Sequence, residues 1–104
     1  MKLRIDPDAG QEATDAADWY DQKKPGLGGD FLDELAAAKQ VIAEHPARWP
    51  RYPDAPLHRQ IHRYRLDRFP YHIVYEIRND EILVVAIAHV ARKPGYWSRR
   101  LRDQ

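Results

Sequence analysis

Residues 69–91 read FPYHIVYEIRNDEILVVAIAHVA, and they determine the architecture more than any other segment. Two runs rich in β-branched and aromatic residues, 69–78 and 81–91, flank the pair Asn79-Asp80, which is typical of a two-residue hairpin turn. With that turn, side chains alternate between the two faces of the hairpin in register. The face predicted to be core consists of Phe69, Tyr71, Ile73, Tyr75, Ile77, Ile82, Val84, Ala86, Ala88 and Val90.

The opposite face of this hairpin carries polar side chains and is predicted to be open. A third strand is predicted over 61–66, where polar and apolar residues alternate. Its His62, Tyr64 and Leu66 side chains are expected to point to the core, so the intervening arginines join the open face. The polar residues predicted to share that face include Arg63, Arg65, His72, Glu76 and His89, with Arg78 and Glu81 next to the turn.

The N-terminal half predicts one short strand followed by two helices. Alternation over residues 2–6 indicates the strand. Asp6-Pro7 then supplies a capping side chain and a proline at the first helical position, and this helix is expected to end by 23–26. A second helix is predicted from residues 27–30 to His45, with an apolar stripe at helical spacing. The stripe consists of Phe31, Leu35, Ala38 and Ile42.

The remaining segment, residues 46–58, contains four of the eight prolines and is predicted to be an extended connection. Trp49 and Tyr52 are expected to anchor it to the core. The short link between the helices favours an antiparallel pair. The expected fold is therefore α+β, in the order β-α-α-β-β-β, with the helical hairpin on one face of a small, mainly antiparallel sheet.

Length and composition exclude several classes of protein. A chain of 104 residues has the size of a single domain, which we expect over residues 1–104. No apolar run is long enough to span a membrane, and the N-terminus lacks a secretory pattern, so a cytoplasmic location is expected. The absence of cysteine excludes disulfides and thiolate metal sites. His58 and His62 straddle the start of a predicted strand, where they do not converge on a metal. No cofactor or metal is expected.

The charge is unevenly distributed along the chain. Residues 1–58 contain 7 Lys/Arg and 11 Asp/Glu, whereas residues 59–104 contain 10 and 5. The second half is therefore expected to bind something anionic, either nucleic acid or an acidic protein segment. Residues 92–100 mix cations with aromatic rings, a composition that suits phosphate contacts and base stacking. The alternative is that the arginines only solvate sheet edges.

Several segments together resemble the RelE/ParE-family toxins of type II toxin–antitoxin systems, and most closely the ParE-like plasmid-stabilisation branch. The segments are RFPYHIVY at 68–75, AHVARKP at 88–94, Tyr96-Trp97 with Arg99-Arg100, Trp19-Tyr20 and GGDF at 28–31. The resemblance implies a β-α-α-β-β-β toxin that a cognate antitoxin neutralises. The antitoxin's C-terminal segment would wrap the toxin and cover its basic surface, giving a hetero-oligomer.

Two activities occur in that family. ParE-like members inhibit DNA gyrase, and we favour this activity because it requires a basic, aromatic surface rather than a catalytic constellation. Tyr, Trp and Arg are the residues that dominate binding at interfaces. The residues expected to bind the target or the antitoxin are Arg63, Arg65, His72, His89, Arg92, Tyr96, Trp97, Arg99 and Arg100.

The alternative implied by the resemblance is a RelE-like endonuclease that cuts mRNA in the ribosome. Cleavage requires a base, cations and an acid near one phosphate. The candidate catalytic residues are Arg65, Glu76, His89, Arg92 and Tyr96. RelE-like ribonucleases depend on clustered lysines and arginines, whereas no lysine occurs between Lys39 and Lys93. A degenerate domain that retains only antitoxin binding is a third possibility, so enzymatic activity stays open.

Overall fold

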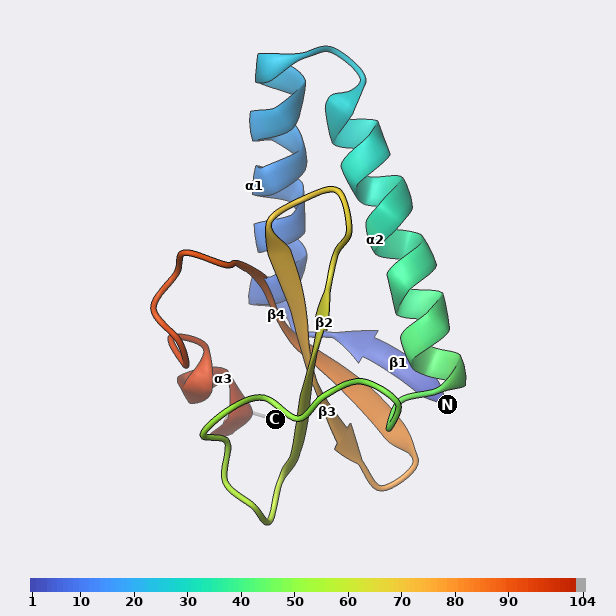
Figure 1. Cartoon of the computed structure of the whole chain (residues 1–104), viewed down its shortest axis with the longest axis vertical. Coiled ribbons are helices and arrows are strands. Elements are labelled where there is room, and N and C mark those ends of the chain that lie inside the picture. The colour runs from blue at the N-terminus through green and yellow to red at the C-terminus, as the bar shows by residue number, and fades with distance from the viewer. Residues whose placement is uncertain (103–104) are drawn as a thin grey trace.

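The computed structural model describes residues 1–102, and its elements follow the expected order (Figure 1). They are β1 (Lys2–Ile5), α1 (Pro7–Lys23), α2 (Leu27–Glu44), β2 (Gln60–Arg65), β3 (Tyr71–Arg78), β4 (Glu81–His89) and α3 (Ser98–Arg102). The strands form one sheet in the order β1-β4-β3-β2, in which β1 runs parallel to β4 and the other pairs are antiparallel. The predicted α+β fold is confirmed.

Residues 103–104, the last two of the domain expected over 1–104, lie outside the described residues. Among residues 1–102, no helix combines the length and the apolar character needed to cross a bilayer.

The two long helices pack on one face of the sheet. The carboxylate of Asp6 accepts the N–H of Asp8 at 2.8 Å and caps α1, as predicted from Asp6-Pro7. Aromatic rings then join both helices to the sheet. Tyr20 of α1 and Phe31 of α2 contact the ring of Phe69 at centroid distances of 4.8 and 5.2 Å. The helix-side core therefore lies between the predicted apolar stripes and one face of β3 and β4.

Gly28 marks a point where α1 and α2 come close together. Its N–H donates to the Asp21 carboxylate at 2.8 Å, and an added Cβ would collide with that carboxylate and with the Ala17 carbonyl oxygen. We expect Gly28→Ala to lower the free energy of unfolding by about 2 kcal/mol, because the helices must separate to accept the methyl group. Denaturation by urea measures the change.

Gly29 provides the matched control for this substitution. An added Cβ at Gly29 has no described atom within 4 Å. Gly29→Ala is therefore expected to stabilise the protein by about 0.5–1 kcal/mol, because alanine loses less backbone entropy in a helix. Equal effects at the two glycines would contradict the close helix approach.

The hairpin of β3 and β4 departs from the predicted register by one residue. Pairing is as expected from the turn up to Tyr75 opposite Val84, but Val74 then lies opposite Ala86. Val85 is the extra residue of a β-bulge, which reverses the faces of everything that follows it in β4. Because 82–88 is an unbroken apolar run, its pattern contains no sign of the slip.

The bulge corrects the predicted faces of the second half of β4. Ala86 and Ala88 lie on the face away from the helices, and Ile87 takes their place in the helix-side core. His89 pairs with Tyr71 and lies on the helix side. The prediction that His89 shares the open face with the other polar residues is therefore wrong.

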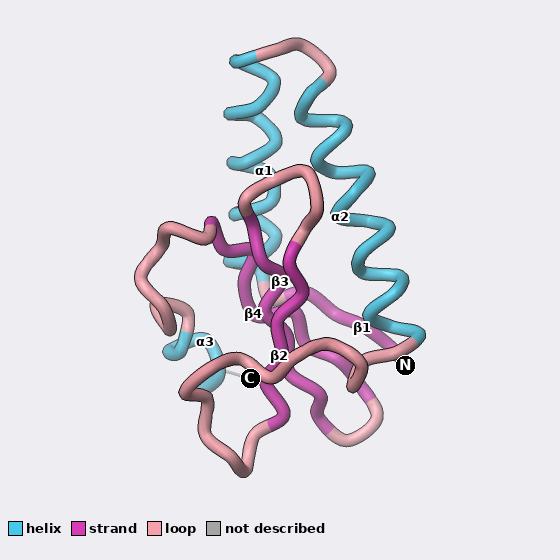
Figure 2. Tube along the Cα trace, in the orientation of Figure 1, coloured by secondary structure: helices cyan, strands magenta, loops and turns pink. Residues whose placement is uncertain are grey.

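The face away from the helices is also less open than predicted. The chain turns back after β4, and α3 lies beside the connection that precedes β2 (Figure 2). Trp97, which is 3% exposed, and Leu101 join a second core with Ile61 and the far face of the sheet. Tyr52 contacts the Trp97 ring edge-on at 5.0 Å. Trp97 is thus a core residue rather than an exposed anchor.

Candidate functional site

Glu12 of α1 is the centre of a polar cluster that ties this helix to the C-terminal segment. Its carboxylate accepts hydrogen bonds from both terminal nitrogens of Arg100, at 2.9 and 3.2 Å, and from the hydroxyl of Tyr96. It also accepts the N–H of Ile87 at 3.1 Å, and Arg92 Nη1 lies 3.9 Å away. We call these five residues, Glu12, Ile87, Arg92, Tyr96 and Arg100, the Glu12 clamp.

The Glu12 clamp satisfies backbone groups at the β-bulge. β1 pairs with β4 only as far as Val84, so beyond that residue the edge of β4 on the β1 side has no strand partner within residues 1–102. Arg100 Nη1 donates to the Val85 carbonyl at 3.0 Å, and Glu12 accepts the N–H of Ile87. Buried backbone polar groups require such partners. The clamp and the bulge therefore stabilise each other.

Tyr96 and Arg92 form the outer part of the clamp. The guanidinium carbon of Arg92 lies 3.8 Å from the centroid of the Tyr96 ring, a cation–π geometry. Burial and then the bond to Glu12 raise the pKa of the Tyr96 phenol far above its ordinary value. The hydroxyl therefore stays protonated and donates to the carboxylate. The Arg92 side chain remains 54% exposed and can meet an anionic partner.

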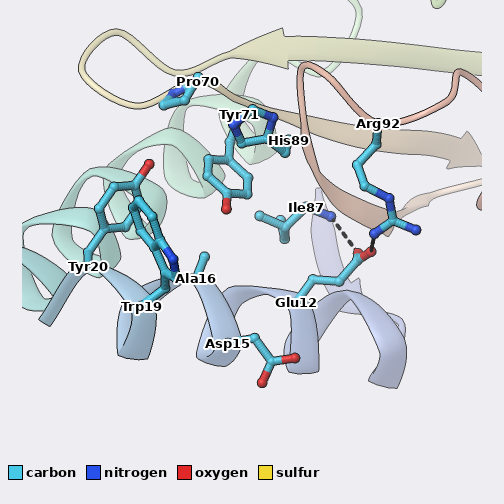
Figure 3. Close-up of a pocket in the computed structure, with 10 residues that line it drawn as sticks. All are labelled: Glu12, Asp15, Ala16, Trp19, Tyr20, Pro70, Tyr71, Ile87, His89 and Arg92. Atoms are coloured by element: carbon cyan, nitrogen blue, oxygen red, sulfur yellow. Dashed lines mark hydrogen bonds and ion pairs between the residues drawn. The ribbon is translucent and has the colours of Figure 1, made fainter. Parts of the chain in front are cut away.

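An aromatic cleft of about 630 Å³ lies between α1 and the open end of the β3–β4 hairpin, opposite its turn (Figure 3). It is lined by Glu12, Asp15, Ala16, Trp19, Tyr20, Pro70, Tyr71, Ile87, His89 and Arg92. Trp19 is 53% exposed, and the imidazole of His89 packs edge-on against Tyr71 at 5.2 Å. His89 Nδ1 accepts the N–H of Ala91 at 3.0 Å. The cleft thus offers exposed aromatic surface beside the cation of Arg92.

Glu76 of β3 is buried on the other face of the sheet between two arginines. Arg59 donates to it at 2.7 and 2.8 Å, and Arg78 donates at 2.6 Å. Burial alone would raise the pKa of Glu76, but the bonds and charges of Arg59 and Arg78 outweigh burial and lower the pKa. Arg78 also donates to the Leu101 carbonyl at 3.1 Å, so this group helps to hold α3. A carboxylate fixed in this way is poorly suited to accept a proton as a general base.

Three of the predicted residues do meet, on the part of this face near the edge strand β2. Arg65 lies opposite His72, and Arg63 lies two residues earlier on the same strand. They line a cleft of about 540 Å³, which we call the β2 cleft; its other lining residues are Trp49, Pro50, Tyr64 and Asp67. Burial, and then the charges of Arg63 and Arg65, lower the pKa of His72. The imidazole is therefore neutral at neutral pH.

The structure thus divides the predicted site residues among several places. Arg92, Tyr96 and Arg100 belong to the Glu12 clamp, and Arg99 lies next to them with Asp8. The other predicted residues lie in the aromatic cleft (His89), on the opposite sheet face (Arg63, Arg65, His72 and Glu76) and in the second core (Trp97). The candidate catalytic residues therefore do not converge on one point.

Glu12 and Trp19 are the site residues that the sequence does not reveal as such. In the sequence, Glu12 is not distinguished from the other acidic residues near the start of the helix, and its partner Arg100 is 88 residues away. Trp19 enters the sequence argument only as part of a family resemblance. Periodicity reports on neighbours within one element, so it contains no information about this long-range pair.

Comparison with known proteins identifies the fold and the family of this chain. The chain is similar in fold to a solved structure titled "Chromosomal ParDE TA system from P. aeruginosa", with a TM-score of 0.75 and 15% identity over 86% of this chain and 95% of that chain. A search of curated proteins gave no match. The family follows from a family model described as "ParE toxin of type II toxin-antitoxin system, parDE", which matches residues 3–94. The chain belongs to this ParE toxin family.

Proposed function

We propose that this protein is a cytoplasmic toxin that inhibits DNA gyrase and is neutralised by a cognate antitoxin. Membership of the ParE family supports this function. The observation that carries it is the basic C-terminal segment: residues 92–102 contain five Lys/Arg and no Asp/Glu. The Glu12 clamp and Glu76 hold this segment against the fold, so its exposed cations are presented on a rigid support. Preorganised cations lose less entropy when they bind an anionic target.

The positions of the candidate catalytic residues support inhibition over cleavage. Glu76 is paired with two arginines, and the Tyr96 hydroxyl donates a hydrogen bond to Glu12. His89 lies across the sheet from Arg65. His89, Arg92 and Tyr96 lie on one side of the sheet, whereas Arg65 and Glu76 lie on the other, so the five candidates do not surround one phosphate. A binding surface has no such requirement.

We further propose that the antitoxin covers the aromatic cleft and the adjoining cations. Exposed apolar surface of this kind is typical of an interaction site. Arg92 lines the cleft and also the basic surface around Arg99, which makes the two surfaces continuous. A segment with large apolar side chains and nearby carboxylates would complement both. Binding there would produce the hetero-oligomer and mask the basic segment.

The direct test is gyrase supercoiling in the presence of the purified protein. We expect dose-dependent loss of supercoiling, and no new cuts in mRNA mapped from translating ribosomes. Cuts without loss of supercoiling would favour a ribonuclease. Unimpaired growth on expression of soluble protein, together with unimpaired supercoiling and intact mRNA, would leave only antitoxin binding.

A charge reversal on the basic segment sharpens this test. Arg99→Glu combined with Arg92→Glu is expected to weaken inhibition of gyrase at least tenfold, because both side chains are exposed and now repel an anionic target. Lys2→Glu combined with Lys24→Glu is the control, since it changes the net charge by the same four units at exposed positions in β1 and at the turn between α1 and α2, away from α3 (Figure 1). Equal loss in both proteins would exclude the basic segment as the binding surface.

A further inference from the structure

We propose that the β2 cleft binds a phosphate group through Arg63, Arg65 and His72. This site uses no residue of the Glu12 clamp or of the aromatic cleft. The proposal therefore goes beyond gyrase inhibition and does not depend on it.

Unpaired cations are the first reason for this assignment. The half-buried Arg59 and Arg78 on this face share the carboxylate of Glu76. By contrast, neither Arg63 nor Arg65 forms an ion pair with any carboxylate of residues 1–102. The two lie on the same face of one strand, where like charges repel. An anion between them would remove that repulsion.

The guanidinium of Arg65 is already held in place. Its Nη1 donates to the carbonyl oxygens of Leu66 and Phe69 at 2.9 and 2.6 Å, at the turn between β2 and β3. Its other N–H groups have no partner within residues 1–102. Arg63 lies over the ring of Tyr52, with its guanidinium carbon 5.7 Å from the centroid. Cations that are fixed before binding favour a planar, bidentate contact with an oxyanion.

The imidazole of His72 provides the third donor. Its Nδ1 is shut off from solvent and has no hydrogen-bond partner among residues 1–102. A buried acceptor without a partner is less costly than a buried N–H without one, so the proton belongs on Nε2. Nε2–H is then the group that His72 can offer to the cleft. Trp49, which also lines the cleft, has a buried indole N–H with no acceptor in the described part of the chain.

The lining of the β2 cleft therefore presents mainly hydrogen-bond donors. Asp67 is the one carboxylate among its lining residues, against two arginines. A volume of about 540 Å³ is large enough for the phosphate to belong to a bigger molecule. A nucleotide and a DNA backbone share the chemistry that Arg63, Arg65 and His72 would recognise. The oxygens of a carboxylate lie in one plane, whereas those of a phosphate are arranged tetrahedrally and suit donors that come from two different strands.

The test is a titration of the purified full chain with inorganic phosphate, followed by NMR. We expect the imidazole signals of His72 and the side-chain N–H signals of Arg63 and Arg65 to shift in a saturable manner. Arg63→Gln is expected to weaken binding roughly fivefold, and Arg63→Lys by less, because lysine keeps the charge but loses the fork. Arg63 is the preferred position, since Arg65 also anchors the β2–β3 turn.

Arg68→Gln is the matched control. Arg68 is 60% exposed, lies between the same two strands, and faces Asp30 at 3.6 Å rather than the β2 cleft. The Arg68→Gln variant should bind phosphate with the same affinity as the unmodified protein. Absence of saturable shifts at His72, or equal weakening by Arg68→Gln, would overturn the proposal. If phosphate binds, a nucleoside monophosphate and a short DNA duplex are compared as competitors. The one that displaces phosphate at the lower concentration is identified as the type of molecule whose phosphate the β2 cleft binds.

Discussion

Replacement of Glu12 by alanine is expected to lower the free energy of unfolding by about 3 kcal/mol. The substitution leaves Arg100 and the Tyr96 hydroxyl without their acceptor and removes the partner of the Ile87 N–H. The C-terminal segment should loosen as a result. Urea denaturation measures the stability, and the indole N–H signal of Trp97 reports whether the second core stays closed.

Asp15→Ala is the control for this prediction. Asp15 lies one turn further along α1, and its recorded partner is the side-chain amide of Gln11 at 2.8 Å. Its removal should change stability by less than about 0.5 kcal/mol. Gyrase inhibition is expected to fall in Glu12→Ala and to persist in Asp15→Ala. A Glu12→Ala protein that keeps full stability would show that the clamp does not hold the segment.

Glu76→Gln is expected to cost about 3 kcal/mol of stability at neutral pH. The amide keeps the shape of the side chain but leaves Arg59 and Arg78 facing each other without a carboxylate. Since Arg78 also bonds the Leu101 carbonyl, α3 should be less protected against hydrogen exchange. Glu81→Gln, at a more exposed pair with Arg4, should cost less than about 1 kcal/mol.

The pH dependence of stability follows from the direction of the pKa shift of Glu76. Its pKa in the folded protein lies below the ordinary value of 4.5, so folding favours the ionised form. The stabilisation is therefore fully present above about pH 4.5 and is lost as the pH falls through the lower, folded value. Glu76→Gln should remove this part of the acid-induced loss. Parallel curves of stability against pH in the two proteins would contradict the role assigned to Glu76.

The sequence predicts most of the fold because its signals are local. Asp6-Pro7 marks the start of α1, and Asn79-Asp80 marks the turn between β3 and β4. The apolar stripe that includes Phe31 identifies the buried face of α2. Each signal lies within one element or one turn, where spacing reflects geometry directly. These predictions are confirmed.

The parts that the sequence does not predict depend on contacts between distant residues. Val85 sits in an apolar run on a strand buried on both faces, so a bulge leaves no trace in its pattern. α3 contains only five residues, and its position depends on Trp97 reaching the second core. The missed bulge places His89 on the other face of the sheet, and the missed position of α3 places Trp97 in the second core. These two differences therefore change the predicted site more than the predicted fold.

The pairing of Glu12 with Arg100 also sets an order of events during synthesis. Glu12 is made first, and Arg100 is added 88 residues later. Helices and the β3–β4 hairpin can form from shorter-range contacts, but this pair forms only after Arg100 has been added. In a nascent chain on the ribosome the two long helices can therefore form before the basic segment is held by Glu12, and the surface proposed to act on gyrase is completed only after Arg100 has been added.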